Sequence, residues 1–144
     1  MKKVLSLFSL AFAFSAFAPH AEAKEMKVKI TLDNQVHYAT LADNPSARSL
    51  FQQLPFTLPL EDYAASEKIA RPQFKLNTAE APARYRGKPG DITYYTPWGN
   101  LALFYKGSAD ADGLIYLGKF DGDFQALATA RKITIERAGK PKRC

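Results

Sequence analysis

Apolar residues recur at every second position along most of the chain, and this period restricts the fold more than any other feature of the sequence. Residues 26–32 alternate apolar side chains with lysine or threonine, and residues 35–41 resume an alternation after Asp33 and Asn34. Two alternating runs around such a break predict a β-hairpin. His37, in the second run, is expected at the strand surface rather than as a metal ligand.

More strands are predicted beyond this hairpin. Residues 56–60, FTLPL, form a short extended piece in which Pro59 implies a sheet edge or a bulge. Residues 61–91 are polar and irregular, with a short strand or turn expected near 67–70, and a loop of that length is often functional. Further alternating runs follow at 91–95, 100–106, 113–120 and 132–138.

Two short helices interrupt the strands. Pro45 suits the first turn of a helix that Pro55 ends, and residues 121–130 predict a second one that buries Phe124 and Leu127. Many short strands with two small helices predict a mainly β fold, an antiparallel barrel whose ends the helices plug. The candidate N-caps are Asp43 or Asn44 for the first helix, and Asp121 or Asp123 for the second.

The first residues have the pattern of an export signal. A cationic start is followed by the apolar run 4–18, which is shorter than the roughly 20 residues that span a bilayer as a helix. Ala21-Glu22-Ala23 fits the A-x-A cleavage pattern. We therefore predict a signal peptide at 1–23 and one mature domain at 24–144. The protein is expected to be exported, periplasmic or secreted, without a stable membrane anchor after cleavage.

The mature chain is basic. The formal net charge of +6 becomes +5 once two lysines and a glutamate leave with the signal. Much of the excess lies in the tail 130–144, which is either a solvated chain end or a surface for an acidic partner. Nucleic acid is not an expected partner for an exported protein.

Cysteine and histidine are scarce. Cys144 is the one cysteine, so it closes no internal disulfide; it is either a free terminal thiol or one half of an intermolecular disulfide. His37 is the one histidine of the mature chain. A His/Cys metal site or a Ser-His-Asp triad therefore has almost no material, and no cofactor is expected.

Aromatic residues concentrate in the stretch 91–107. The strand period assigns Ile92, Leu101 and Leu103 to the core together with about half of these aromatics. Trp98 differs, because it lies in the break between Pro97 and Gly99. It either folds back over the barrel mouth or contacts a partner.

A second polar group lies in DYAASEK, residues 62–68. These side chains either form a solvated turn or lie beside the aromatic loop as donor and acceptor for a small ligand or a peptide backbone. We predict a ligand site from both segments, and its candidate residues are Tyr63, Glu67, Lys68, Tyr95 and Trp98.

Several segments in combination resemble the small prokaryotic cyclophilin-like domain family. They are a helix that ends in QLP, then DY and EKI, then GDITYYTPWGNLALFYKG, then GLIYLGKF. The resemblance covers about Met26 to Glu136. It implies a closed antiparallel eight-stranded β-barrel with two short helices. It brings no settled activity, because most of that family has no assigned role.

Two functions of different class follow from this resemblance. The first is a non-catalytic binding module for a peptide or small ligand. The alternative is a divergent peptidyl-prolyl cis-trans isomerase, which needs an apolar seat for the proline and a cation near the twisting imide. The Phe-His-Arg motif of classical cyclophilins is missing here. Arginines lie elsewhere in the sequence, at Arg48, Arg71, Arg84 and Arg86, but none of them matches the catalytic arginine of the family, so the catalytic residues are left unassigned.

Overall fold

The computed structural model describes residues 25–139, and within them the chain forms eleven strands, one α-helix and one 3₁₀ helix. In chain order these are β1 (Met26–Leu32), β2 (Gln35–Leu41), α1 (Pro45–Gln53), β3 (Phe56–Pro59), β4 (Glu61–Tyr63), β5 (Glu67–Ala70), β6 (Arg84–Arg86), β7 (Asp91–Tyr95), β8 (Asn100–Phe104), β9 (Asp110–Asp112), β10 (Leu114–Phe120), η1 (Gln125–Thr129) and β11 (Lys132–Arg137).

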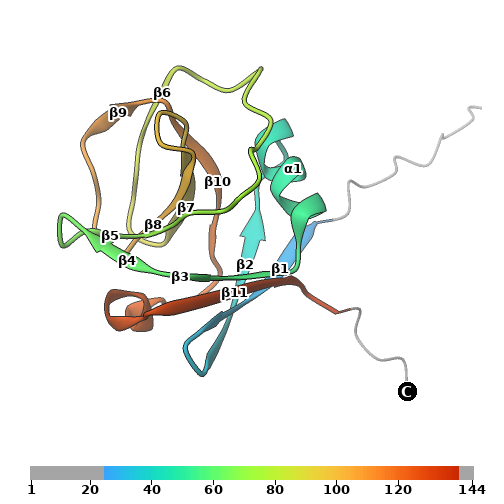
Figure 1. Ribbon diagram of the computed structural model, residues 1–144, viewed down its shortest axis with the longest axis vertical. Coiled ribbons are helices and arrows are strands. Elements are labelled where there is room, and N and C mark those ends of the chain that lie inside the picture. Colours follow the sequence, from blue (N-terminus) through green and yellow to red (C-terminus); the bar gives the residue numbers. More distant parts are fainter. Residues whose placement is uncertain (1–24, 140–144) are drawn as a thin grey trace, which may run out of the picture.

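Nine strands form one antiparallel sheet in the order β3-β11-β1-β2-β10-β7-β8-β5-β4. The two edge strands, β3 and β4, are separated in the chain by Leu60 alone. The segment 56–63 therefore pairs with β11 at one edge and with β5 at the other, and the sheet curls into a nearly closed barrel (Figure 1). Counted as one bent strand, this segment gives the eight strands that were predicted. The bend follows Pro59.

The barrel core comes from one side of each strand. Val28, Ile30 and Leu32 of β1 are at most 1% exposed, as the alternation predicts. The prediction that Ile92, Leu101 and Leu103 belong to the core is also confirmed, because all three are buried.

His37 does not lie on an open strand surface. It shares the inward side of β2 with the buried Ala39 and lies half-buried, with its ring 6.0 Å from that of Phe120. The opposite side of β2 is the exposed one, and it carries Val36 and Tyr38. The surface prediction for His37 is therefore wrong. The alternation fixes which residues share a side, and packing against the rest of the barrel decides which side is buried.

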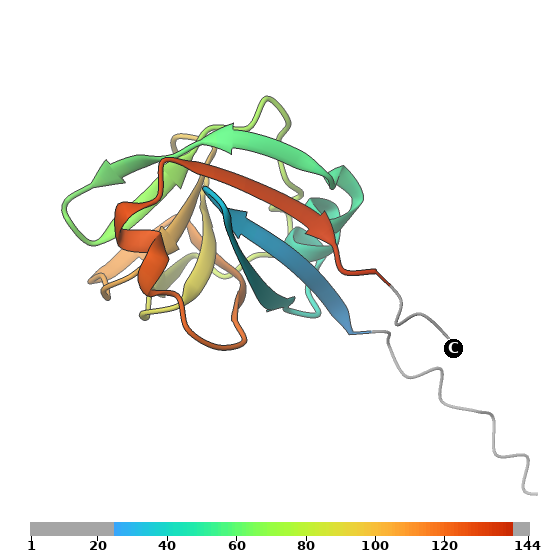
Figure 2. The same ribbon diagram turned by 90° about the horizontal axis from the view of Figure 1, so that it is seen from below.

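The first helix follows its predicted signals. The Asn44 side chain accepts a hydrogen bond from the backbone N–H of Ala47, Pro45 begins α1, and Leu54 ends it before Pro55. The second is a shorter 3₁₀ helix, η1, which buries Leu127. Asp123 lies just before η1, and its carboxylate accepts a hydrogen bond from the N–H of Gln125, the first residue of η1. The two helices lie on opposite sides of the barrel (Figure 2).

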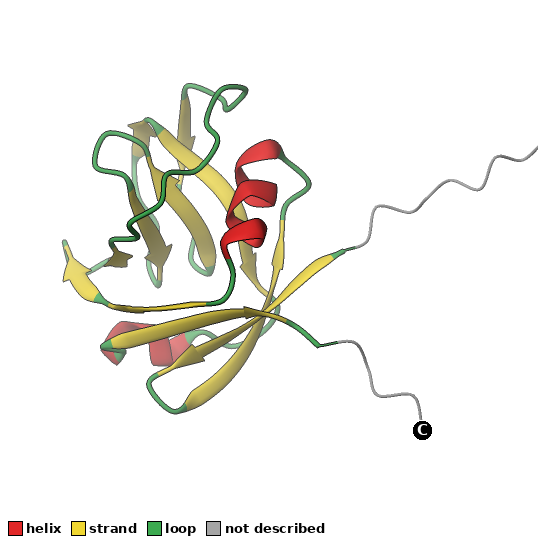
Figure 3. Ribbon diagram, turned by 45° about the vertical axis from the view of Figure 1, so that its right-hand side comes forward, coloured by secondary structure: helices red, strands yellow, loops and turns green. Residues whose placement is uncertain are grey.

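A two-stranded sheet made of β6 and β9, here called the outer sheet, covers part of the barrel's outside. Tyr85 of β6 and Ala111 of β9 pack on a buried outward-facing cluster of Ile69, Ala102, Phe104 and Leu114. The loop 71–83 leads to this sheet along α1, where Ser46 Oγ donates to the carbonyl of Asn77 at 2.6 Å (Figure 3). This second layer was not predicted.

Several predictions concern residues outside the described range. The predicted signal peptide at 1–23 and Cys144 lie there, as does the end of the basic tail. Between residues 25 and 139, no helix is long and apolar enough to cross a membrane.

Candidate functional site

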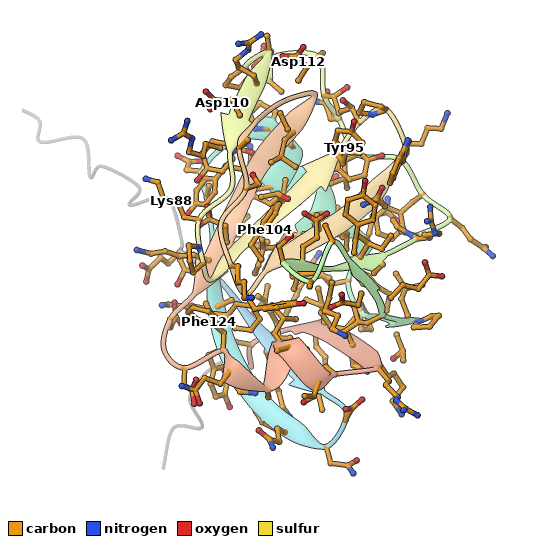
Figure 4. The ribbon with its side chains drawn as sticks, turned by 90° about the vertical axis from the view of Figure 1, so that its left-hand side faces the viewer. Lys88, Tyr95, Phe104, Asp110, Asp112 and Phe124 are labelled. Carbon is orange, nitrogen blue, oxygen red and sulfur yellow. The ribbon has the colours of Figure 1, made fainter. Side chains whose placement is uncertain are left out.

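A cleft of about 280 Å³ opens on the outside of the barrel, between the outer sheet and the turn 96–99. We call it the outer cleft. One wall is formed by Tyr63, Glu67, Tyr95, Trp98, Asn100 and Phe104. Leu114 of β10, the strand neighbour of Tyr95, also lies on this barrel side, and the other wall is formed by residues 108–111. Figure 4 faces this side, with Asp110 of β9 and Tyr95 of β7 on either side of Phe104.

Strand alternation decides which predicted site residues reach this cleft. Tyr63 of β4 and Glu67 of β5 are directly opposite each other, and both line it. Lys68 is the next residue along β5, so its side chain points to the other side of the strand. Of the five predicted residues, four line the outer cleft together and Lys68 does not.

Lys68 belongs to a separate polar cluster with Asp62 and Tyr105. The buried Lys68 has its Nζ 3.5 Å from Asp62 Oδ1, and the Tyr105 hydroxyl donates to the same oxygen at 2.6 Å. This hydrogen bond makes the largest contribution to lowering the pKa of Asp62, and the positive charge of Lys68 lowers it further. The same hydrogen bond raises the pKa of Tyr105 to about 12. Lys68 thus has a structural partner in Asp62, across the strand from the cleft.

Three aromatic rings meet at the mouth of the outer cleft. The Trp98 ring lies 5.6 Å from the ring of Tyr63 and 5.4 Å from that of Tyr95, and it is nearly perpendicular to both, at 85° and 83°. Trp98 is 53% exposed and Tyr63 is 44% exposed. Large aromatic surfaces therefore remain in contact with water, although edge-to-face contacts hold the rings in place.

The turn that carries Trp98 is fixed from both sides. Gly99 adopts a positive φ of 66°, which a glycine reaches without strain. Thr96 donates to the carbonyl of Gly113 through its backbone N–H at 2.9 Å and through its hydroxyl at 2.8 Å. Because Gly113 follows β9 directly, the turn is attached to the end of the outer sheet, and the two walls of the cleft are tied together.

The polar groups of the outer cleft include the side-chain oxygens of Glu67, Asn100 and Asp110. Glu67 is half-buried, and burial, with a smaller contribution from the charge of Asp62, raises the pKa of its carboxyl. Asn100 is 1% exposed; its Nδ2 donates to the carbonyl of Leu101, and its Oδ1 has no hydrogen-bond partner among the described residues. Asp110 pairs with Arg86, whose Nε is 3.7 Å from Asp110 Oδ1. A buried acceptor without a donor is costly.

Glu67→Gln is expected to stabilise the fold at pH 7. The raised pKa means that the folded protein disfavours the charged carboxylate, so stability is greatest at low pH and falls as pH rises through the pKa of Glu67. Removing the charge should therefore raise the melting temperature at pH 7, through a gain in the free energy of unfolding of no more than about 1 kcal/mol, because water screens a half-exposed group. Near pH 3 the difference from the native chain should vanish.

Thermal melts of the native chain, Glu67→Gln and Glu136→Gln at the two pH values test this. Glu136 is a half-buried carboxylate on β11, on another part of the barrel. An equal gain from both substitutions would contradict the explanation, because it would assign the effect to overall charge rather than to the surroundings of Glu67.

The sequence reasoning did not identify several cleft residues. Asn100, Phe104 and Leu114 were assigned to strands, and residues 108–111 lie between two predicted strands. A signal for the outer sheet was present in the sequence: R-x-R at 84–86 and D-x-D at 110–112 are equal in length and opposite in charge. In the structure Arg84 pairs with Asp112 at 2.9 Å and Arg86 with Asp110. Among residues 25–139, no group of three His, Cys, Asp or Glu side chains is placed to hold a metal ion.

Comparisons with known proteins give a family and a fold. The model of a family described as the cyclophilin-like family matches residues 30–136. The solution structure of the hypothetical protein AF2241 from Archaeoglobus fulgidus is similar to this chain with a TM-score of 0.58 and 17% sequence identity, over 79% of this chain and 95% of that one. No curated protein matches the sequence.

Proposed function

Because the chain belongs to the cyclophilin-like family, we propose that it uses this barrel as an exported, non-catalytic binding module for a small ligand or a peptide side chain. The observation that carries the proposal is the outer cleft, which brings together Tyr63 and Glu67 from one hairpin and Tyr95 and Trp98 from another. Its volume of about 280 Å³ is near the lower end of the usual range for ligand pockets, which begins at about 300 Å³. It suits one small molecule or one side chain.

The chemistry of the lining supports binding rather than catalysis. The hydroxyl of Ser108 is already engaged, because it donates to the carbonyl of Ala109 and accepts from the N–H of Gly87. The residues that line the outer cleft include no histidine, cysteine, lysine or arginine. Nucleophilic catalysis needs a nucleophile with an adjacent base, and no hydrogen bond among the described residues joins either cleft carboxylate, Glu67 or Asp110, to a hydroxyl of the lining.

The isomerase alternative depends on a cationic donor beside an apolar surface. Arg84 borders another cleft, of about 250 Å³, together with Pro45, Pro82 and Tyr116. Its guanidinium, however, pairs with Asp112, and Arg48, Arg71 and Arg86 each pair with a carboxylate as well. This geometry favours the binding module.

Little or no prolyl isomerase activity is therefore expected. A protease-coupled assay with Ala-Pro and Leu-Pro peptides at high protein concentration should give the uncatalysed rate. Acceleration well above background that disappears in Arg84→Ala, but persists in Arg131→Ala as a control, would replace the binding proposal with the isomerase.

Ligand binding itself is testable with nuclear magnetic resonance and a panel of small fragments. We expect some fragments to shift the indole signal of Trp98 and the side-chain amide signal of Asn100, and Trp98→Ala to abolish these responses. Tyr38→Ala is the matched control, because Tyr38 is an exposed aromatic on β2, away from the cleft. If no fragment in the panel shifts these signals, the outer cleft is not a binding site.

Export is tested separately. Mass spectrometry of the protein from its native host should find Lys24 as the first residue. Soluble protein that retains Met1 would contradict this part of the proposal.

A further inference from the structure

The outer cleft has a charge opposite to that of the whole chain. The chain carries a formal net charge of +6, whereas the charged residues that line the cleft, Glu67 and Asp110, are both acidic. Asp110 is paired with Arg86, but no cation of the described residues lies within ion-pair distance of the Glu67 carboxylate. A ligand that brings a positive charge would supply the missing counter-ion.

The aromatic groups beside Glu67 suit the same kind of ligand. A cation is attracted to the face of an aromatic ring when it lies within about 6 Å of the ring centre, and tryptophan attracts it most strongly. The rings of Tyr63 and Tyr95 lie 5.6 and 5.4 Å from that of Trp98 and stand nearly at right angles to it. One group in contact with Trp98 is thus within reach of more than one ring.

The rings and Glu67 then each have a use. The rings offer apolar, electron-rich faces to the methyl groups of an alkylated cation. Such a cation is weakly hydrated, so moving it from water into the cleft costs little hydration free energy. The raised pKa of Glu67 reflects burial without a counter-ion, a cost that a bound cation would offset.

We propose that the outer cleft recognises an alkylated ammonium group, held between the faces of Tyr63, Tyr95 and Trp98 with the Glu67 carboxylate as its counter-ion. This inference rests on the proposed function and names its ligand class. The same head group occurs in free quaternary amines and in methylated lysine side chains of peptides, and the cleft chemistry is shared by both.

The test uses choline and its uncharged isostere 3,3-dimethylbutan-1-ol, which have almost the same shape. Trp98 is the only tryptophan in the sequence, so its fluorescence reports on the cleft directly. We expect choline to bind at least about tenfold more tightly than the isostere. Glu67→Gln should remove most of that difference while the fold stays intact, and Glu136→Gln should keep it. A peptide with trimethyl-lysine, compared with choline, distinguishes a peptide source from a free amine.

The outcomes separate this inference from the proposed function. Equal binding of choline and the isostere at Trp98 would overturn the ammonium proposal and leave a binding cleft for neutral ligands. Binding of panel fragments but not of choline would have the same meaning. The control Tyr38→Ala should bind choline as tightly as the native chain does. If Tyr63→Ala also binds choline at full strength, the cation binds elsewhere and the proposal is overturned. If neither choline nor any fragment reaches the cleft, the proposed function fails with it.

Discussion

Leu103→Ala is expected to lower the free energy of unfolding by about 2–5 kcal/mol. Leu103 of β8 is fully buried, and its backbone pairs with β5 on one side and with β7 on the other. A strand held at both edges cannot move to fill the space that the shorter side chain leaves. The cost should therefore include a cavity as well as the lost burial.

Trp98→Ala is the comparison that gives this result its meaning. Trp98 is larger than Leu103 but 53% exposed, so its removal should cost only about 1 kcal/mol, mainly from the edge contacts with Tyr63 and Tyr95. Denaturant unfolding of both variants beside the native chain measures the two costs. Equal losses would mean that Trp98 packs as core, and would weaken both proposals for the outer cleft.

The barrel was predictable because its information is local. Each long strand has its own alternation of apolar residues. A slip of one residue in the strand pairing would turn its core-facing side chains outward, so the alternation fixes the register. This is why Ile92, Leu101 and Leu103 could be placed correctly from the sequence. Trp98 was singled out for the complementary reason: it lies in a turn, where no strand period buries it.

The outer sheet was not predictable by the same reasoning. Its strands have three residues each, mostly charged, and Arg86 pairs with Asp110 across a long stretch of chain. A strand this short contains too few residues to display a period. One wall of the outer cleft comes from β9 and the residues just before it, so the sequence could suggest the aromatic wall but not the wall that faces it.

The different roles of Glu67 and Lys68 became clear only in the structure. Glu67 and Lys68 looked like a donor and acceptor pair because they are adjacent in sequence. Adjacent residues on a strand point to opposite sides, so Glu67 lines the cleft and Lys68 pairs with Asp62 behind it. Asn100 carries no sequence signal of a site at all, since only burial reveals that its Oδ1 lacks a donor.

Gly118→Ala is the second substitution with a large expected effect, a loss of about 1–3 kcal/mol or more. Gly118 lies on β10 at the register shift opposite β7 and pairs with Leu41 of β2. A Cβ here would lie 2.4 Å from the carbonyl oxygen of Thr40 and 2.8 Å from the Cα of Leu41. Both are backbone atoms of the neighbouring strand, so the clash cannot be relieved by turning a side chain.

The barrel is vulnerable at this position because β10 and β2 are joined by a short seam of three residue pairs, Gly118 with Leu41, Lys119 with Thr40 and Phe120 with Ala39. Gly122→Ala is the matched control: nothing lies within 4 Å of its added Cβ, and it should be neutral or stabilising by up to about 1 kcal/mol. Denaturant unfolding gives the two stabilities, and hydrogen exchange of the β2 and β10 amides shows where the barrel opens. If Gly118→Ala is as stable as Gly122→Ala and protects these amides equally well, the two strands are not in the close contact on which closure of the barrel depends. A large loss in the free energy of unfolding, with rapid exchange confined to the amides of β2 and β10, would show that the barrel opens first between these two strands.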